Sequence, residues 1–375
     1  MPPAHPEAKT LFQKGVETFE KRQYETAISY LDDAIKIDND YGDAWCCRGL
    51  CLGHLKRYDE ALASFDRAIA IDSTDIEARL SRGIVLRDCG KYEEALDNYE
   101  EAIKVCPVSC EAWYSKGDIL VCLGRFLEAI PCYDRALEFN PEFYKAYSNR
   151  GNAQTQLGRF KAAIRSFDKA LKLQPDDPEV WYNRGCALMF SGDRKAAIVD
   201  FDKAIAINPD RTSYWMNKGS CYSGLGDQDT ALQCYDRVLE LNPNETHAWN
   251  NRGLILRKLG KVKEAIAAYD RAIEADPNNY ESWDNRGFAL TKLGQYSEAL
   301  ASVNRSLEIN PNHTNGIYNR GYCYALQGKT KLAVDCIIQA IEANPRRYLM
   351  PAKTDPTFKA LRKNKRFQLF LRNAR

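Results

Sequence analysis

The stretch from Thr246 to Asn279, THAWNNRGLILRKLGKVKEAIAAYDRAIEADPNN, decides the fold of this chain. Its apolar and small residues recur at helical spacing. Gly260 interrupts the pattern in the middle, and Pro277 interrupts it near the end. The stretch therefore predicts two short amphipathic helices, over about 246–259 and 263–276, joined by a tight turn.

Gly253 lies inside the first of these helices, where a glycine costs about 1 kcal/mol relative to alanine. Such a cost indicates a packing role, in which the missing side chain lets the second helix approach closely. Ala265 and Ala272 are the matching small residues on the second helix. One such hairpin cannot bury its apolar face alone and needs neighbours of the same kind.

The sequence supplies those neighbours at a period of 34 residues. A glycine recurs at Gly15, Gly49, Gly83, Gly117, Gly151, Gly185, Gly219, Gly253, Gly287 and Gly321, and an alanine follows each one twelve residues later. Ten repeats result, over 8–41, 42–75, 76–109, 110–143, 144–177, 178–211, 212–245, 246–279, 280–313 and 314–347.

The repeated pattern W-x(3)-G, L/Y, A-x(3)-F/Y-x(2)-A, P resembles the tetratricopeptide repeat (TPR) family over about residues 8–347. The resemblance implies an all-α fold, a right-handed α-α superhelix in which ten helical hairpins form a TPR solenoid. The six tryptophans all occupy the fourth repeat position, and we expect them to pack in the core. Eight prolines, from Pro107 to Pro345, each close a repeat.

The end of the chain leaves the period. Asp355 followed by Pro356 is typical of a helix start, and the run is similar to the DPxFxxLRxxxRF segment that closes many bacterial arrays. We expect 348–375 to form a basic C-terminal capping helix. Its contacts with repeat ten would be made by Phe358, Leu361 and Phe370 around Ile337 and Ile341.

Charge is distributed unevenly along the chain. The net charge is +2, yet residues 346–375 carry ten Lys or Arg and one Asp, which leaves residues 1–345 at about −7. This basic segment allows an alternative function, binding of an anionic surface such as nucleic acid or a membrane. We regard such a partner as unlikely, because the aromatic residues of the segment are needed for the cap.

Composition excludes several other classes of protein. The thirteen cysteines include no CxxC pair, and no hydrophobic leader or apolar run of membrane-spanning length is present, which favours the cytoplasm. The four histidines, His5, His54, His247 and His313, match no metal or catalytic motif. We therefore expect no enzyme activity, no catalytic residue, no metal and no cofactor.

In TPR superhelices, the first helix of each repeat lines a concave groove. Six consecutive repeats carry asparagine at the sixth position, and we call these residues the asparagine ladder: Asn149, Asn183, Asn217, Asn251, Asn285 and Asn319. The segment around Asn149 is similar to the repeats of O-GlcNAc transferase, in which such a ladder holds an extended polypeptide by its backbone.

The predicted function is a non-catalytic protein-protein interaction scaffold that binds an extended peptide or a partner helix in this groove. Lys145, Asn152 and Tyr182 are further candidate peptide-binding residues. An equally weighted alternative is that the ladder only fixes helix packing. No repeat has lysine at the fifth position, which disfavours recognition of a C-terminal carboxylate. The sequence names no particular partner or oligomeric state.

A second pair of periodic positions predicts ion pairs. The seventh position is Lys or Arg in all ten repeats, and the twenty-fifth is Asp or Glu in the first eight. We expect these residues to pair, within a repeat or with the next one, with arginine often making two hydrogen bonds to the carboxylate. Repeats nine and ten have Asn304 and Ile338 at the acidic position, so Arg286 and Arg320 would be less restrained if pairs form within a repeat.

Overall fold

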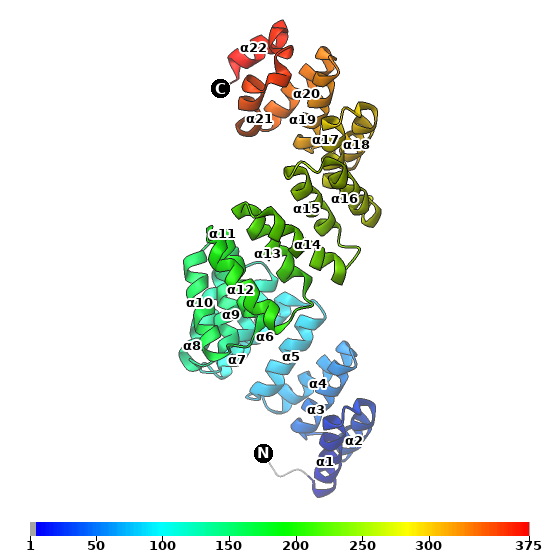
Figure 1. Ribbon diagram of the computed structural model, residues 1–375. Helices are drawn as coiled ribbons and strands as arrows, with labels where there is room; N and C mark the ends of the chain where they lie inside the picture. The colour runs from blue at the N-terminus through cyan, green and yellow to red at the C-terminus, as the bar shows by residue number, and fades with distance from the viewer. Residues whose placement is uncertain (1–4, 375) are drawn as a thin grey trace. The chain divides into compact units, whose positions relative to one another are not determined.

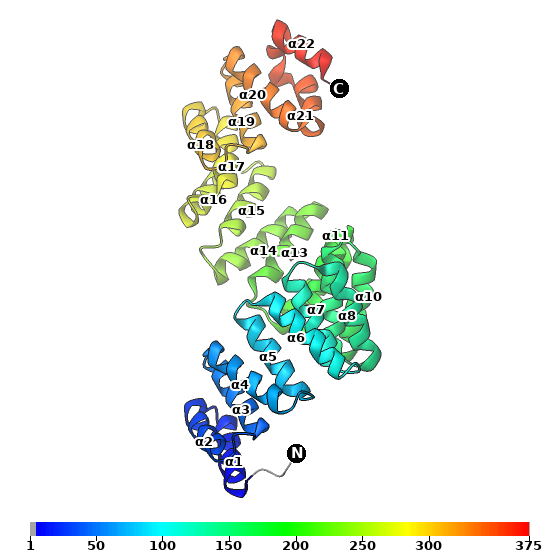
Figure 2. The same cartoon turned by 180° about the vertical axis from the view of Figure 1, so that it is seen from behind.

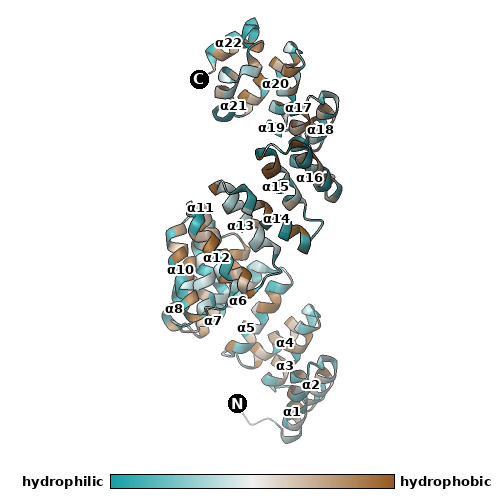
Figure 3. Ribbon diagram, viewed as in Figure 1, coloured by the Kyte–Doolittle hydropathy of each residue, from teal (hydrophilic) through white to brown (hydrophobic). Residues whose placement is uncertain are grey.

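The structure, a computed structural model, describes residues 5–374. The chain is 81% helical, and the described residues contain no strand. The helices form two compact units that divide between Ser191 and Gly192, in the turn between α11 and α12 (Figures 1 and 2). Along each helix, hydrophilic and hydrophobic residues alternate as expected of amphipathic elements (Figure 3).

The first unit contains five complete helix pairs and one further first helix. Their bounds are α1 Pro6–Glu20, α2 Tyr24–Ile37, α3 Gly42–His54, α4 Tyr58–Ile71, α5 Ile76–Asp88, α6 Tyr92–Val105, α7 Cys110–Cys122, α8 Phe126–Phe139, α9 Tyr144–Gln156, α10 Phe160–Leu173 and α11 Pro178–Ser191.

The second unit begins with a second helix and ends with the C-terminal segment. Its α-helices are α12 Arg194–Ile207, α13 Thr212–Leu225, α14 Gln228–Leu241, α15 Thr246–Lys258, α16 Val262–Ala275, α17 Tyr280–Lys292, α18 Tyr296–Ile309, α19 Thr314–Leu326, α20 Thr330–Ala343, α21 Pro345–Thr354 and α22 Lys365–Asn373. Two short 3-10 helices, η1 Pro356–Phe358 and η2 Leu361–Lys363, lie between α21 and α22.

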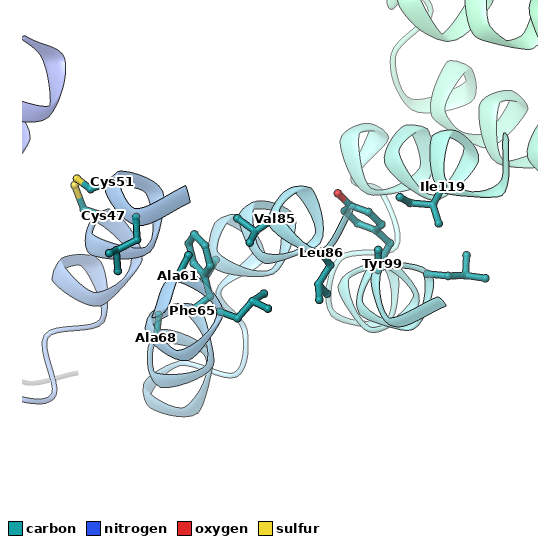
Figure 4. Packing of buried hydrophobic residues seen from close by; sticks show 14 of the residues in the cluster. Cys47, Cys51, Ala61, Phe65, Ala68, Val85, Leu86, Tyr99 and Ile119 are labelled. Carbon is teal, nitrogen blue, oxygen red and sulfur yellow. The ribbon is translucent and has the colours of Figure 1, made fainter. Parts of the chain in front are cut away.

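Within each unit the packing is nearest-neighbour. Each second helix packs against the first helix of its own repeat and against the first helix of the next repeat. In the first unit, one apolar cluster runs through the first four repeats and into α9. Figure 4 shows part of it, including Phe65, Leu86, Tyr99 and Ile119. No single central core is needed, as in other repeat proteins.

Close approach of the two helices in a repeat explains the periodic glycine. A Cβ atom on Gly83 would lie 2.4 Å from the Tyr99 ring, and one on Gly253 would lie 2.5 Å from the Tyr269 ring. These aromatic residues are buried. The predicted packing role of Gly253 is therefore confirmed, because any larger residue would displace a core ring.

The turn between the two helices of a repeat requires a left-handed backbone conformation. Eight repeats place glycine there, at φ angles of 69° to 96°. The first two repeats place Arg22 and Lys56 in the same conformation, at φ 59° and 60°. An L-residue other than glycine is strained there by roughly 1–2 kcal/mol.

The predicted ion pairs form, and they run between repeats. The seventh residue of each repeat from two to nine contacts the twenty-fifth residue of the preceding repeat, with N–O distances of 2.5–2.9 Å. The pairs are Arg48–Asp32, Arg82–Asp66, Lys116–Glu100, Arg150–Asp134, Arg184–Asp168, Lys218–Asp202, Arg252–Asp236 and Arg286–Asp270.

These pairs are partly buried: the cationic side chains are 16–28% exposed and the carboxylates 39–58% exposed. The expectation of two hydrogen bonds to one carboxylate is wrong for Arg48 and Arg286. Each uses Nε for the carboxylate and donates its second hydrogen bond, from Nη1, to a serine of its own repeat. The guanidinium group thereby connects two repeats. Arg286 is fully restrained, because its partner is Asp270 in the preceding repeat.

The six tryptophans are half-buried instead of enclosed in the core. Each indole N–H donates to a backbone carbonyl six residues earlier, at the end of the preceding repeat. In five of the six cases, that carbonyl belongs to the proline that closes the repeat, at 2.7–3.0 Å; Trp45 instead bonds to Asn39 at 3.0 Å. The ring packs on the core with one face while its N–H stabilises the turn between repeats.

The C-terminal segment packs on repeat ten. Phe358 and Leu361 are buried in the same apolar cluster as Ile337 and Ile341, as expected. Phe370 is only partly buried, and Phe367 takes the fully buried place on α22. The segment is also richer in structure than the single expected helix, because α21 begins at Pro345, directly after α20.

Candidate functional site

The asparagine ladder lies on first helices in both units. In the first unit, Asn149 is on α9 and Asn183 is on α11. The second unit holds the other four, Asn217 on α13, Asn251 on α15, Asn285 on α17 and Asn319 on α19. Five of the six side chains are half-buried, and Asn319 is 6% exposed.

Three of these amides donate to the first helix of the preceding repeat. Asn149 Nδ2 donates to Asp118 Oδ1 at 2.8 Å and to the Tyr114 hydroxyl at 3.0 Å. In the second unit, Asn285 Nδ2 donates to Asn250 Oδ1 at 3.0 Å, and Asn319 Nδ2 donates to Asp284 Oδ1 at 2.8 Å. The residues at the fifth and ninth positions are thus the partners of the sixth.

These bonds fix the orientation of the amides, because a primary amide whose nitrogen is held has its oxygen directed away from that partner. The same bonds support the packing interpretation of the ladder, since they join neighbouring first helices. The two roles are compatible: an asparagine has both donor and acceptor capacity, and these contacts use the donor.

Asp118 is a buried carboxylate that the sequence analysis missed. It accepts hydrogen bonds from the Tyr133 hydroxyl at 2.7 Å and from Asn149. Burial raises the pKa of Asp118, and hydrogen bonds from Tyr133, Asn149 and Tyr114 and the charge of Arg87 oppose that rise. The sequence carried one signal for it: Asp118 is the sole charged residue at the ninth repeat position.

Asp284 forms a similar centre in the second unit. Its carboxylate is 1% exposed and accepts from Asn319 at 2.8 Å and from Asn315 at 2.5 Å. His313 Nε2 lies 3.1 Å from the same carboxylate. Three side chains of repeat ten therefore converge on one residue of repeat nine, which holds the two first helices together.

The remaining predicted residues are also on first helices of the first unit. Lys145 and Asn152 are on α9, where Lys145 is exposed and Asn152 is half-buried. Tyr182 is on α11 and is half-buried. Their placement on the same helices as Asn149 and Asn183 leaves them available as neighbours of the ladder.

The described residues show no arrangement typical of catalysis. No group of three or more His, Cys, Asp or Glu side chains within 5–374 is placed to hold a metal ion. Burial raises the pKa of Cys46 to about 12 and those of Cys132 and Cys234 to about 11, so these thiols are protonated and poorly nucleophilic at neutral pH. Among the helices described here, none is both long and apolar enough to cross a membrane.

Comparison with solved structures supports the fold. A tetratricopeptide repeat protein from Parabacteroides merdae ATCC 43184 is 18% identical, with a TM-score of 0.51 over 67% of this chain and 100% of that chain. MamA protein is 25% identical, with a TM-score of 0.43 over 45% of this chain and 92% of that one. YrrB, described as a TPR protein with an unusual peptide-binding site, is 23% identical, with a TM-score of 0.41 over 51% and 100%. A search of curated proteins gave no match.

Family models match most of the chain. Models described as tetratricopeptide repeat match 8–41, 42–75, 144–177, 178–211, 222–280, 268–301 and 315–347. Models described as TPR repeat match 83–121 and 117–158. With the tandem helix pairs, the glycine–aromatic contacts and the ion pairs between repeats, these matches show that the chain belongs to the tetratricopeptide repeat family.

Proposed function

We propose that this protein is a non-catalytic protein-interaction scaffold, and that the concave surface of its first helices binds an extended peptide or a partner helix. The observation that carries the proposal is the asparagine ladder with its held amides. Asn149, Asn285 and Asn319 each use the amide nitrogen for a neighbouring repeat. Their oxygens are thereby oriented at regular intervals, one for each repeat.

An oriented amide oxygen suits a peptide backbone, because it accepts from a peptide N–H whatever side chain follows. Each such bond contributes a net ~0.5–1.5 kcal/mol. Ordering a flexible peptide offsets much of that gain. The ladder in either unit then supports binding in the micromolar range, with Lys145, Asn152 and Tyr182 adding side-chain preference in the first unit.

Backbone recognition can be tested with peptides selected from a random library on the full-length protein. For each selected peptide, alanine scanning should change affinity little. Methylation of successive backbone nitrogens should weaken binding several-fold at alternate positions, because a methylated nitrogen cannot donate. Uniform tolerance of N-methylation would contradict recognition through amide oxygens.

The matched protein variant is Asn183→Ala combined with Asn251→Ala, one ladder residue in each unit. We expect at least about a tenfold loss of peptide affinity, equivalent to one or two hydrogen bonds, with the thermal midpoint within a few degrees of wild type. Asn278→Ala is the control, because Asn278 is exposed in the turn that closes repeat eight. Equal losses in the control, or none in the ladder variant, would remove the ladder from the binding site.

A further inference from the structure

A groove of about 1260 Å³ lies in the first unit, in the first three repeats. It is lined by residues of α1, α3 and α5, by the end of α4 and by the turns that precede α3 and α5. We call it the N-terminal groove. It contains none of the ladder residues, all of which occur from repeat five onward.

The floor of the N-terminal groove is apolar. Phe12 and Val16 of α1, Leu50 of α3 and Ile76 of α5 line it, and each is half-buried. The Phe12 ring packs against the Tyr41 ring with centroids 5.0 Å apart. These side chains are therefore held in place by the core while part of their surface remains open to an apolar ligand group.

The rim of the groove is acidic. Six carboxylates line it against two cations, Lys9 and Arg67; the acids are Asp38, Asp40, Asp43, Asp72, Asp75 and Glu77. Three of the six accept hydrogen bonds from backbone N–H groups of the turns or the helix start, which fixes their positions. Asp40, Asp43 and Glu77 are exposed.

The electrostatic effect of this rim reaches the groove floor. Burial raises the pKa of the Cys46 thiol to about 12, and the negative charges of Asp75, Glu77 and Asp43 add to the rise. The pKa of Tyr41 is raised by burial and by the charges of Asp43 and Asp38. Both shifts have the sign expected where an added cation would be stabilised.

We infer that the N-terminal groove binds a basic segment of another protein, with Lys or Arg side chains against the acidic rim and apolar side chains on the floor. This inference rests on the proposed function in taking the first-helix surface as the binding surface. It adds a location in repeats one to three and a partner chemistry. The occupant is identified by charge complementarity, because an acidic peptide would place like charges against six fixed carboxylates.

The acidic character is local to these repeats. The second repeat position is acidic in α3 and α5, at Asp43 and Glu77, but is Lys145 in repeat five and His247 in repeat eight. The turn that ends each second helix begins with Asp38 and Asp72 in repeats one and two, and with a neutral residue in repeats three to seven. A basic segment would therefore favour this end of the first unit.

The test uses the full chain and a fluorescein-labelled peptide of four Lys-Leu-Ser repeats, with Glu-Leu-Ser and Lys-Ser-Ser peptides for comparison. Fluorescence anisotropy should show the Lys-Leu-Ser peptide binding at least about tenfold more tightly than either other peptide. Its affinity should fall as sodium chloride is raised, because exposed charges are screened. Equal binding of the Glu-Leu-Ser peptide would overturn the inference.

The decisive variant is Asp43→Asn combined with Glu77→Gln, which removes two exposed rim charges with little change in shape. It should lose about tenfold in affinity for the Lys-Leu-Ser peptide. Glu111→Gln is the matched control, because Glu111 has the same repeat position in repeat four and does not line the groove. Circular dichroism and thermal unfolding of each variant separate a binding effect from misfolding.

Three outcomes would decide against the inference. The rim variant might bind like the wild type; the Asn183→Ala, Asn251→Ala variant alone might lose the peptide, which would leave the proposed function standing and move the site to the ladder. Analytical ultracentrifugation gives the third: oligomers of the wild type that the rim variant abolishes would make a second copy of this chain the occupant. Loss in the rim variant alone, from a monomer, supports a separate basic partner.

Discussion

At the scale of single residues, the cation at the seventh position and the residue at the twenty-third position of one repeat match each other. Arg48, Arg150 and Arg286 each bond to a serine at the twenty-third position as well as to a carboxylate of the preceding repeat. Lys116 and Lys218, which have no second planar arm, stand opposite Cys132 and Cys234. A forked guanidinium needs a second acceptor and an ammonium does not.

Arg320 is the exception that this arrangement exposes. It has the seventh position in repeat ten, but Asn304 replaces the acid in repeat nine. Its Nε is buried and has no hydrogen-bond partner among the residues that the structure describes. The substitution Asn304→Asp should create the ninth ion pair and raise the free energy of unfolding by about 0.5–1 kcal/mol, measured by thermal and urea unfolding.

Two controls make this prediction specific. Asn312→Asp adds the same charge in repeat nine at an exposed turn position, and it should leave stability unchanged. Combining Asn304→Asp with Arg320→Met should cancel the gain, because the new carboxylate then has no cation to meet. A gain that persists without the arginine would mean that the aspartate acts in another way.

The direction of these ion pairs could not have been predicted from the sequence. Positions seven and twenty-five both repeat every 34 residues, so a pair within one repeat and a pair with the preceding repeat have the same period. Only coordinates distinguish the two. The amide contacts of the ladder were hidden for a different reason: their partners, Tyr114, Asn250 and Asp284, differ in residue type and so show no periodic signal.

At the scale of the helices, the sequence was a good guide. Helices expected over 246–259 and 263–276 are α15, Thr246–Lys258, and α16, Val262–Ala275. Helical spacing and breaker residues are local properties, so one sequence reveals them. The N-terminal groove was not foreseen, because its rim combines helix residues with turn residues that recur in only the first repeats.

The turn inside repeat two carries a testable strain. Lys56 has φ 60°, where the later repeats place glycine. Lys56→Gly should raise the thermal midpoint, because relief of roughly 1–2 kcal/mol of backbone strain exceeds the ~0.5–1 kcal/mol entropic cost of glycine. The reverse change, Gly90→Lys at φ 78°, should lower the midpoint. A lower midpoint for Lys56→Gly would show that the lysine side chain makes a stabilising contact of greater value.

At the scale of the whole molecule, stability is a sum of contacts between neighbouring repeats. A terminal repeat lacks one neighbour and must cover its outer face in another way. In the second unit, the chain solves this with α21, η1, η2 and α22, which bury Tyr348, Phe358, Leu361 and Phe367 against α19 and α20. The basic residues of this segment are therefore attached to a structural element, which weakens the alternative of a free anionic-surface binder.

The cap makes the last prediction. Deleting residues 346–375 should expose the apolar surface around Ile337 and Ile341, which now lies under the cap, and should cause aggregation. The sharper comparison is Phe358→Ser, at 0% exposure, with Leu369→Ser, at 62% exposure. The first should cost about 3–5 kcal/mol, the range for losing a buried phenylalanine, and the second almost nothing, by thermal unfolding and light scattering. If both variants and the truncated chain stay monomeric and equally stable, the segment does not cap repeat ten. Its ten basic residues would then be free to bind anions, with the steep salt dependence of a phosphate binder.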